Sequence, residues 1–246
     1  MKNLRLIGLL AIGGLTFNIA RAEVTVLVDQ QQYVFANEPR LLEVLAPLAA
    51  HQNWYWPAAT LYKIDNSELE QTRQQLLKQL STLAKAKSQK DPQLALSLKQ
   101  LTADITSWRL ARRLPIKIDY DLARIKAASN PQFTHGNYIL RLASRSEVVH
   151  ILGAVNDSQQ VAHMAHADVS KYDTKQRLTD FADKDYVIVI QADGRVIKAP
   201  VAYWNKTHQE VMPGSQLFVP FKESLFFPEL SKINQQILKL AVNRVL

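Results

Sequence analysis

The sequence predicts an α+β protein made of two β-rich units, with a helical hairpin inserted in the first unit and an amphipathic helix at the C-terminus. Short alternating apolar runs bounded by turn residues occur in both halves, a long leucine-rich pattern interrupts the first half, and the end carries an apolar helical stripe. We therefore expect a first domain at residues 23–145 with the hairpin at about 65–110, a second domain at 146–222, and the terminal helix within 223–246.

Composition limits the function classes. The chain has 246 residues, 47% of them hydrophobic, which is enough for ordinary buried cores. It has no cysteine, which excludes disulfides, thiolate zinc sites, a thiol nucleophile and a cysteine-linked lipid anchor. The formal net charge is +8, and +5 after residues 1–22, a mild excess that could favour an acidic partner such as an anionic polysaccharide or a membrane surface, or could belong to a solvated face. No basic run is interleaved with aromatics, so a nucleic-acid partner is not expected.

Residues 1–22 have the pattern of a cleavable export signal. A positively charged start precedes an apolar run from Leu6 to Ile19, and Ala20-Arg21-Ala22 fits an A-x-A cleavage site. The apolar run is too short for a confident membrane-spanning helix. We expect cleavage before Glu23 and a periplasmic protein.

The first unit is predicted to open with a strand at Val24–Val28 and a second strand at Tyr33–Phe35. A helix should follow from Pro39, with Pro47 ending it early. Two arms at helical spacing form the predicted hairpin, separated by a break at Lys90-Asp91-Pro92. Their apolar positions are Leu69, Leu76, Leu80 and Leu83 in the first arm, and Leu94, Leu98, Leu101, Ile105 and Trp108 in the second.

Further strands are predicted at Pro115–Ile118, near Leu140, and at Val148–Leu152. In the second unit, an Asp193-Gly194 turn joins two alternating runs, which is a strong hairpin signal, and a Pro213-Gly214 turn leads into a last strand. These strand orders are compatible with two small β-grasp domains.

The C-terminal segment places Leu230, Ile233, Ile237 and Leu240 on one helical stripe. Its polar face has few cations, so packing on its own protein is favoured over a membrane or partner role.

Several motifs resemble the GfcC/YjbG family of periplasmic capsule and exopolysaccharide assembly proteins. The run from Ala199 to Ser215 is similar to the family's A-P-V-A-x-W-N-K-x-H-x-E-x-x-P-G-S, and Arg113 to Asp121 resembles its R-L-P-x-K-x-D-P-D. Gly153-Ala154-Val155 and Tyr55–Ala59 match shorter family motifs, with Tyr120 standing where the family has proline.

The resemblance covers nearly all of the chain after residue 22. It implies two β-grasp domains similar to the soluble ligand-binding domains of the outer-membrane polysaccharide exporter Wza, with a helical hairpin in the first and an amphipathic C-terminal helix. It also implies a role in polysaccharide export without an established activity.

Arg113 is the main candidate binding residue, because it lies between an apolar helix end and a strand, where a guanidinium held in a cleft would bind a carboxylate or phosphate. The hypothesis places it between the first unit and the base of the hairpin. The alternative is an internal ion pair with Asp119, Asp121 or Glu43.

The remaining candidates are aromatic or polar. Trp56, Tyr203 and Trp204 could stack on sugar rings or fill the core, and Asn205 and His208 lie in the same run as the last two. Asp119 and Asp121, at strand spacing, would share a face like a glycosidase pair or form a solvated edge. His163, His166 and Asp168 lack an evident fourth ligand, so neither a metal nor a cofactor is expected.

The sequence thus favours a non-enzymatic periplasmic protein of capsule or exopolysaccharide assembly or export, which binds glycan or another secretion component. An outer-membrane-associated partner is compatible with this role, and a monomer is expected. The alternative is a periplasmic polysaccharide-modifying hydrolase.

Overall fold

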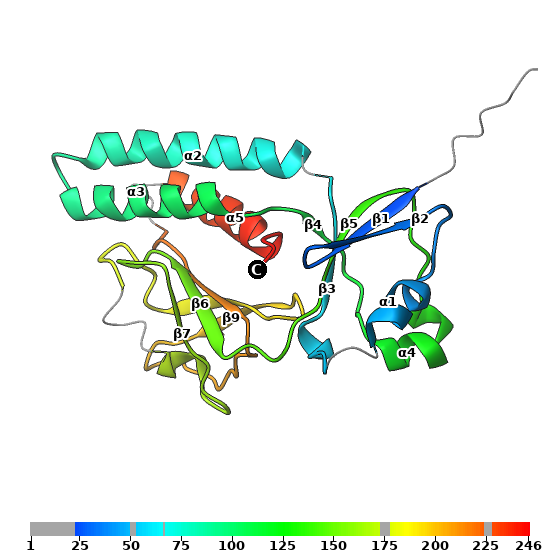
Figure 1. The fold of residues 1–246 in the computed structure, drawn as a ribbon. Helices are drawn as coiled ribbons and strands as arrows, with labels where there is room; N and C mark the ends of the chain where they lie inside the picture. The colour runs from blue at the N-terminus through cyan, green and yellow to red at the C-terminus, as the bar shows by residue number, and fades with distance from the viewer. Residues whose placement is uncertain (1–22, 50–52, 66, 173–177, 224–227) are drawn as a thin grey trace, which may run out of the picture.

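A computed structural model describes residues 23–49, 53–65, 67–172, 178–223 and 228–246 (Figure 1). The predicted export signal at residues 1–22 lies outside these ranges. Within them the protein is α+β, with two five-stranded mixed sheets and five α-helices.

The first sheet has the strand order β2-β1-β5-β3-β4. β1 is antiparallel to β2 and parallel to β5, and β3 is antiparallel to both β5 and β4. The predicted opening strands are confirmed. The strands are β1 (Val24–Val28), β2 (Gln31–Phe35), β3 (Thr60–Lys63), β4 (Arg112–Arg113) and β5 (Gly136–Arg141).

The second sheet repeats this topology. Its order is β7-β6-β10-β8-β9, with β6 antiparallel to β7 and parallel to β10, and with β8 antiparallel to both β10 and β9. Position by position, the pairing senses equal those of the first sheet. The strands are β6 (Val148–Gly153), β7 (Gln159–Ala162), β8 (Tyr186–Ile190), β9 (Val196–Pro200) and β10 (Gln216–Val219).

Short helices complete the first unit. Helix α1 (Leu41–Ala49) and helix α4 (Tyr120–Ile125) contribute to one core with the first sheet, and the 3-10 turns η1 (Trp56–Ala58) and η2 (Ala127–Ser129) lie in its connections. Pro47 lies inside α1, which continues to Ala49, so the helix does not end at this proline; its ring removes one backbone donor.

The helical hairpin is confirmed as α2 (Ser67–Lys87) and α3 (Pro92–Ser107). Asp91 caps α3 by accepting a hydrogen bond from the Leu94 amide at 3.1 Å. Although the hairpin connects β3 to β4 of the first sheet, it extends over the second sheet (Figure 1). The buried side chains of both arms share one continuous core with the strands of the second sheet.

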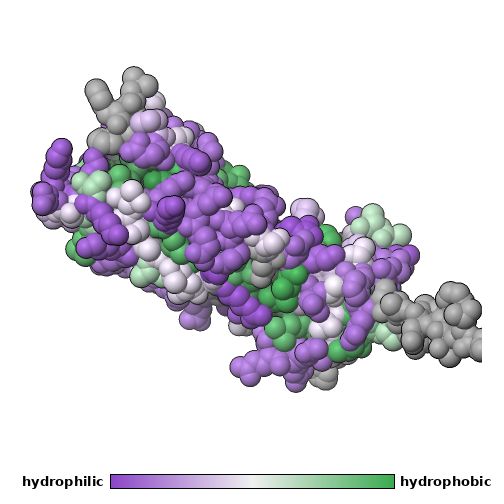
Figure 2. All heavy atoms as spheres, turned by 90° about the horizontal axis from the view of Figure 1, so that it is seen from above, coloured by the Kyte–Doolittle hydropathy of each residue, from purple (hydrophilic) through white to green (hydrophobic). Residues whose placement is uncertain are grey.

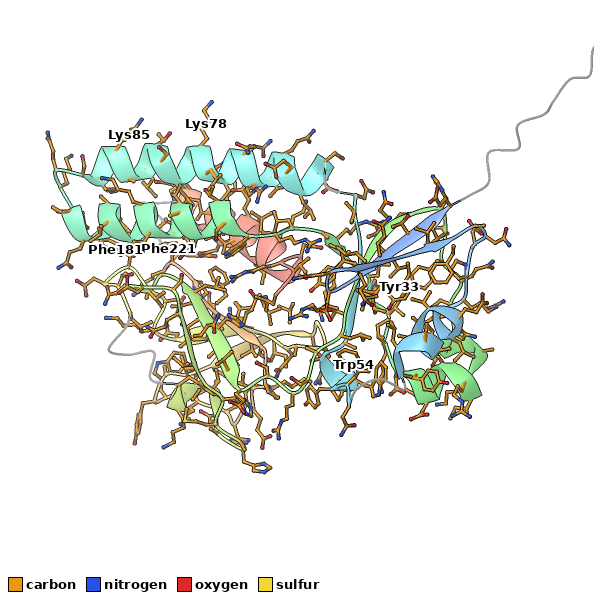
Figure 3. All side chains as sticks on the ribbon, in the orientation of Figure 1. Tyr33, Trp54, Lys78, Lys85, Phe181 and Phe221 are labelled. Atoms are coloured by element: carbon orange, nitrogen blue, oxygen red, sulfur yellow. The ribbon has the colours of Figure 1, made fainter. Side chains whose placement is uncertain are left out.

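The outer side of the hairpin is hydrophilic. In the view onto it, polar residues cover most of the surface (Figure 2). Lys78 and Lys85 project outward from α2, whereas Phe221, which is fully buried, lies on the inner side below α3 (Figure 3). The leucine spacing of α2 therefore marks the face directed at the second unit.

The C-terminal helix α5 (Glu229–Val242) lies between the hairpin and the second sheet (Figure 1). Its predicted stripe is buried, which confirms that it packs on its own protein. The buried Asn234 side chain donates to the Phe221 carbonyl at 2.8 Å and accepts from the Phe221 amide at 2.9 Å. In the described part of the chain, no helix combines the length and apolar character needed to cross a bilayer.

The residues after α5 return to the first unit. The Ala111 amide donates to the Asn243 carbonyl at 3.0 Å, and the Val245 amide donates to the Arg109 carbonyl at 2.9 Å. The Tyr62 hydroxyl donates to the Arg244 carbonyl at 3.1 Å. The C-terminal segment therefore connects both units through backbone hydrogen bonds.

Two turns are confirmed and one strand prediction is wrong. Gly214 has φ of +83°, as the Pro-Gly turn requires, and the Asp193-Gly194 turn joins β8 to β9. Residues 115–118 do not form a strand, because the ladder with β3 ends after Arg113. This segment instead lines a cleft between the units.

We predict that Ile237→Ala lowers the free energy of unfolding by about 2 to 5 kcal/mol, because Ile237 is fully buried where α5 meets the shared core. Urea denaturation followed by circular dichroism measures this loss. Gln235→Ala, on the exposed side of the same helix, is the control and should change stability by less than about 0.5 kcal/mol. Equal stabilities of the two variants would mean that α5 is not part of the folded core.

Candidate functional site

The junction cleft is a recess of about 710 Å³ between the two units. One wall is the segment from Arg113 to Asp119, and the other is the turn from Asp193 to Arg195. Trp56, Met212 and Val242 add apolar surface. Its size falls within the range of small-molecule binding sites.

The structure brings three sequence-predicted site residues together in this cleft: Arg113, Asp119 and Trp56. The other candidates lie elsewhere. Asp121 is exposed on α4, and four candidates belong to the loop after β9 in the second unit, namely Tyr203, Trp204, Asn205 and His208.

Arg113 lies at the boundary between the two units. Its amide donates to the Asn243 side chain at 2.9 Å, and its guanidinium donates to the Ala192 carbonyl of the second unit at 2.6 Å. The hypothesis correctly placed Arg113 in a cleft beside the first unit, but it was wrong that the base of the hairpin forms the opposite wall. The opposing wall is the Asp193-Gly194 turn, which sequence separation alone does not place beside β4.

The alternative of an internal ion pair for Arg113 is also not found. Among the described residues, none of Asp119, Asp121 and Glu43 forms a salt bridge with it. Burial lowers the pKa of the guanidinium, while Tyr62 and Asp193 raise it. Arginine stays protonated, so the site carries a half-buried positive charge.

Gly194 allows the close approach of the two units at Arg113. It has φ of +95°, and a Cβ atom added there would lie 2.7 Å from the Arg113 Nε atom. The left-handed backbone favours glycine at this position, and a side chain there would displace the Arg113 guanidinium from its observed place. The Asp-Gly turn thus shapes the cleft as well as the β8–β9 hairpin.

The prediction that Asp119 and Asp121 face the same way on a strand is wrong. Asp119 is the N-cap of α4 and accepts from the Leu122 amide at 3.0 Å. Asp121 lies in the first turn and pairs with Arg124 at 3.7 Å on the surface. A carboxylate that caps a helix accepts from backbone amides that would otherwise lack partners, and this local hydrogen bonding favours a helix start over the predicted strand.

A second cavity, which we call the inner recess, adjoins the junction cleft at Arg113. It measures about 160 Å³, and its polar lining includes Arg113, Arg141, Arg244, His150 and Gln216. Sequence reasoning missed the last four of these residues. The one available signal was Gln216 within an otherwise apolar central strand, where a polar side chain requires a buried partner.

The loop after β9 holds the other candidates. Tyr203 is fully exposed and Trp204 is 75% exposed, so neither fills the core. The Asn205 side chain donates to the Asp185 carbonyl at 3.3 Å. Trp56 is half-buried beside the core of the first unit.

Asp168 fastens the end of this loop to the second unit. Its buried carboxylate accepts from the Ser170 amide at 3.0 Å and the Gln209 amide at 2.9 Å, and it pairs with Lys206 at 3.4 Å. Despite its burial, these donors hold the pKa of Asp168 at about 2. His208 lies 3.7 Å from the same carboxylate.

These histidines and acids do not form a metal site. Across the described ranges, no group of three or more such side chains has an arrangement that could hold a metal ion. The His163 ring instead contacts the Val211 carbonyl at 2.9 Å. The cluster therefore holds the loop in place through hydrogen bonds and ion pairs.

His150 lines the inner recess, and its pKa is strongly lowered there. Burial, followed by the nearby positive charge of Arg244, lowers the pKa of His150 from 6.5 to about 4. The imidazole is therefore neutral at pH 7. Protonation is more favourable in the unfolded chain, so it opposes folding as the pH falls between these two values.

We predict that stability decreases as the pH falls from 6.5 to about 4, by up to about 1.4 kcal/mol per pH unit from His150. His150→Gln removes this titration, so its stability curve should be flatter over the same range. Urea denaturation at successive pH values measures the difference between the curves. His135→Gln, at an exposed position, is the control, and a His150→Gln curve parallel to the wild-type curve would contradict the burial of a neutral imidazole.

Comparison with known proteins identifies relatives over almost the whole chain. The family model described as "Capsule biosynthesis GfcC, N-terminal" matches residues 20–145, and the model "Capsule biosynthesis GfcC C-terminal" matches residues 157–246. The chain is also 31% identical over 193 residues to the uncharacterized protein YjbG of Escherichia coli K12, with 78% of each chain covered.

Proposed function

Because the chain belongs to the GfcC family of capsule biosynthesis proteins, we propose that it is a non-enzymatic periplasmic component of capsule or exopolysaccharide assembly or export. In this role the junction cleft binds an acidic part of the glycan or of another secretion component. The exported location rests on the signal-like residues 1–22.

The position of Arg113 carries this proposal. A half-buried guanidinium that spans two cavities and lacks an ion-pair partner among the described residues favours an anionic ligand, since burying a charge is costly unless it is compensated. Trp56 offers an apolar surface in the same cleft, against which a sugar ring can pack. Charge and aromatic surface together suit an acidic polysaccharide.

The repeated sheet topology supports the assignment of both units to the β-grasp fold. Each sheet has its first hairpin at one edge and its last strand in the centre, parallel to the first strand. A likeness to the soluble ligand-binding domains of the Wza exporter remains part of the proposal. Binding modules of this kind would suit an accessory protein of a polysaccharide exporter.

A hydrolase is less well supported by the geometry. Two carboxylates line the junction cleft, but Asp119 caps α4 and Asp193 accepts from the Arg195 guanidinium at 2.7 Å. Both groups are thus engaged in local structure. A glycosidase needs one carboxyl group kept protonated and another free to act as a base or nucleophile.

We predict that Arg113→Ala abolishes polymer export in cells while changing the melting temperature by no more than about 3 °C. The substitution removes one hydrogen bond to the Ala192 carbonyl, and such a bond contributes only about 1 kcal/mol net. Immunoblotting of surface polysaccharide and differential scanning fluorimetry measure the two effects.

Arg124→Ala is the matched control, because Arg124 is an exposed arginine that pairs with Asp121 and lies over the Tyr120 ring, both within α4. It should leave both measurements unchanged. Full export by the Arg113→Ala cells would remove the basis of the proposal. A large loss of melting temperature would assign Arg113 to folding instead.

The proposed export signal has a separate test. If residues 1–22 are cleaved, the intact mass of the protein recovered from the periplasm corresponds to a chain that starts at Glu23. A mass that includes residues 1–22 would show that the apolar run is retained. Ala22→Arg, which disrupts the A-x-A site, should cause accumulation of the longer form.

A further inference from the structure

The inner recess has a one-sided charge distribution. Three arginines line it, Arg113, Arg141 and Arg244, and among the described residues no acidic side chain belongs to its lining, which also includes Leu246, the last residue of the sequence. The walls come from both sheets and from the segment after α5. A cavity between two folded units that gathers three cationic side chains needs compensating anionic or acceptor groups.

Among the described residues, one of the three arginines has an ion-pair partner. Arg141 pairs with Asp29 at 2.8 Å and donates to the Leu246 carbonyl at 2.6 Å. Within the described ranges, the ion pairs include neither Arg113 nor Arg244. Two positive charges therefore remain for a ligand.

Arg244 is held in place by stacking. Its guanidinium lies over the Trp108 ring at 4.9 Å from the centroid, a cation–π contact that does not use its N–H donors. Burial lowers the pKa of Arg244, and the negative charge of Asp104 raises it. The group stays charged, and its N–H donors are available to an oxyanion.

Gln216 provides an independent sign of a ligand. The side chain is 3% exposed and lines the inner recess, and its Oε1 atom is buried without a hydrogen-bond partner. The amide orientation is determined, because Nε2 donates to the Ala241 carbonyl at 2.8 Å. A buried acceptor of this kind requires a donor, which neither a bare carboxylate nor a chloride ion supplies.

We propose that the inner recess binds a compact oxyanion that carries its own hydroxyl donor, either the acid group of a sugar acid with its neighbouring hydroxyl or a monohydrogen phosphate. Arg113 and Arg244 donate to the anionic oxygens, and a shift of the Gln216 side chain on binding allows its buried Oε1 atom to accept from the hydroxyl. A volume of about 160 Å³ suits one such group rather than a whole oligosaccharide. The inference deepens the proposed function by naming the acidic substituent, but the site itself does not depend on that function.

The test uses the purified protein with three probes: glucuronate, inorganic phosphate, and glucose as the neutral control. Calorimetry should detect binding of at least one anion, and a hundredfold excess over its Kd should raise the melting temperature by about 3 °C or more. The anion that binds identifies the source of the oxyanion. No binding of either anion, or equal binding of glucose, would overturn the proposal.

Two variants tie the binding to the inner recess. Arg244→Gln should weaken anion binding by about tenfold or more, because one charged donor is lost. Gln216→Glu places an internal carboxylate near the arginines, so it should abolish anion binding, although losing the Nε2 donor to the Ala241 carbonyl should lower its melting temperature. Arg124→Gln, on the surface of α4, is the control and should bind as the wild type does.

Unchanged binding by the Gln216→Glu protein would place the anion elsewhere and overturn the assignment, even if Arg244→Gln is poorly folded. The proposed function fails separately. If export persists in Arg113→Ala cells while the purified wild type still binds the anion, the proposed anion site is supported and the proposed role in export is contradicted.

Discussion

The structure depends on the burial of the α2–α3 hairpin against the second sheet and α5. The hairpin is inserted between two strands of the first sheet, yet Leu76, Leu80, Leu98 and Leu101 belong to the core of the second unit. Each such side chain contributes about 2 kcal/mol when fully buried, which is large against the net stability of a domain. This packing fixes the two sheets relative to each other. The junction cleft exists because that relation is fixed.

The same packing explains why the C-terminal amphipathic helix is not free. Its apolar stripe lies between the hairpin and the second sheet, and the segment after it pairs with the backbone of residues 109–111. Polar anchors at Asn234 and Gln216 fix its position along the sheet. A membrane or partner role for α5 would require breaking the core of the second unit, so we assign recognition to the cavities between the units.

Much of the fold could be predicted from the sequence, because strand alternation, helical leucine spacing and turn residues are local signals. The β8–β9 hairpin followed from Asp193-Gly194, and both hairpin arms followed from their apolar spacing. The partner of the hairpin could not be predicted, since periodicity identifies the apolar face of a helix and not the surface it covers. Asp119 was wrongly assigned to a strand, because its spacing from Asp121 fits a strand and the sequence does not show that its carboxylate caps a helix.

The candidate site was only partly predictable. Arg113 and Trp56 could be selected as residue types, but their common cleft depends on the second unit and on the absence of a side chain at Gly194. Arg244 and His150 are far apart in the sequence and meet only because the segment after α5 returns between the sheets. The family assignment adds the biological setting, while the arginine-lined cavities indicate what the protein recognises.

Hydrogen exchange on the Leu98→Ala protein tests the central claim most directly, because Leu98 is fully buried in a hairpin that belongs to the first unit by sequence. Our account predicts that amides of β6 and β10 in the second sheet exchange about 30-fold faster or more than in the wild type, as expected for a loss of at least about 2 kcal/mol. Unchanged protection of β6 and β10, with faster exchange confined to the hairpin and the first sheet, would contradict it.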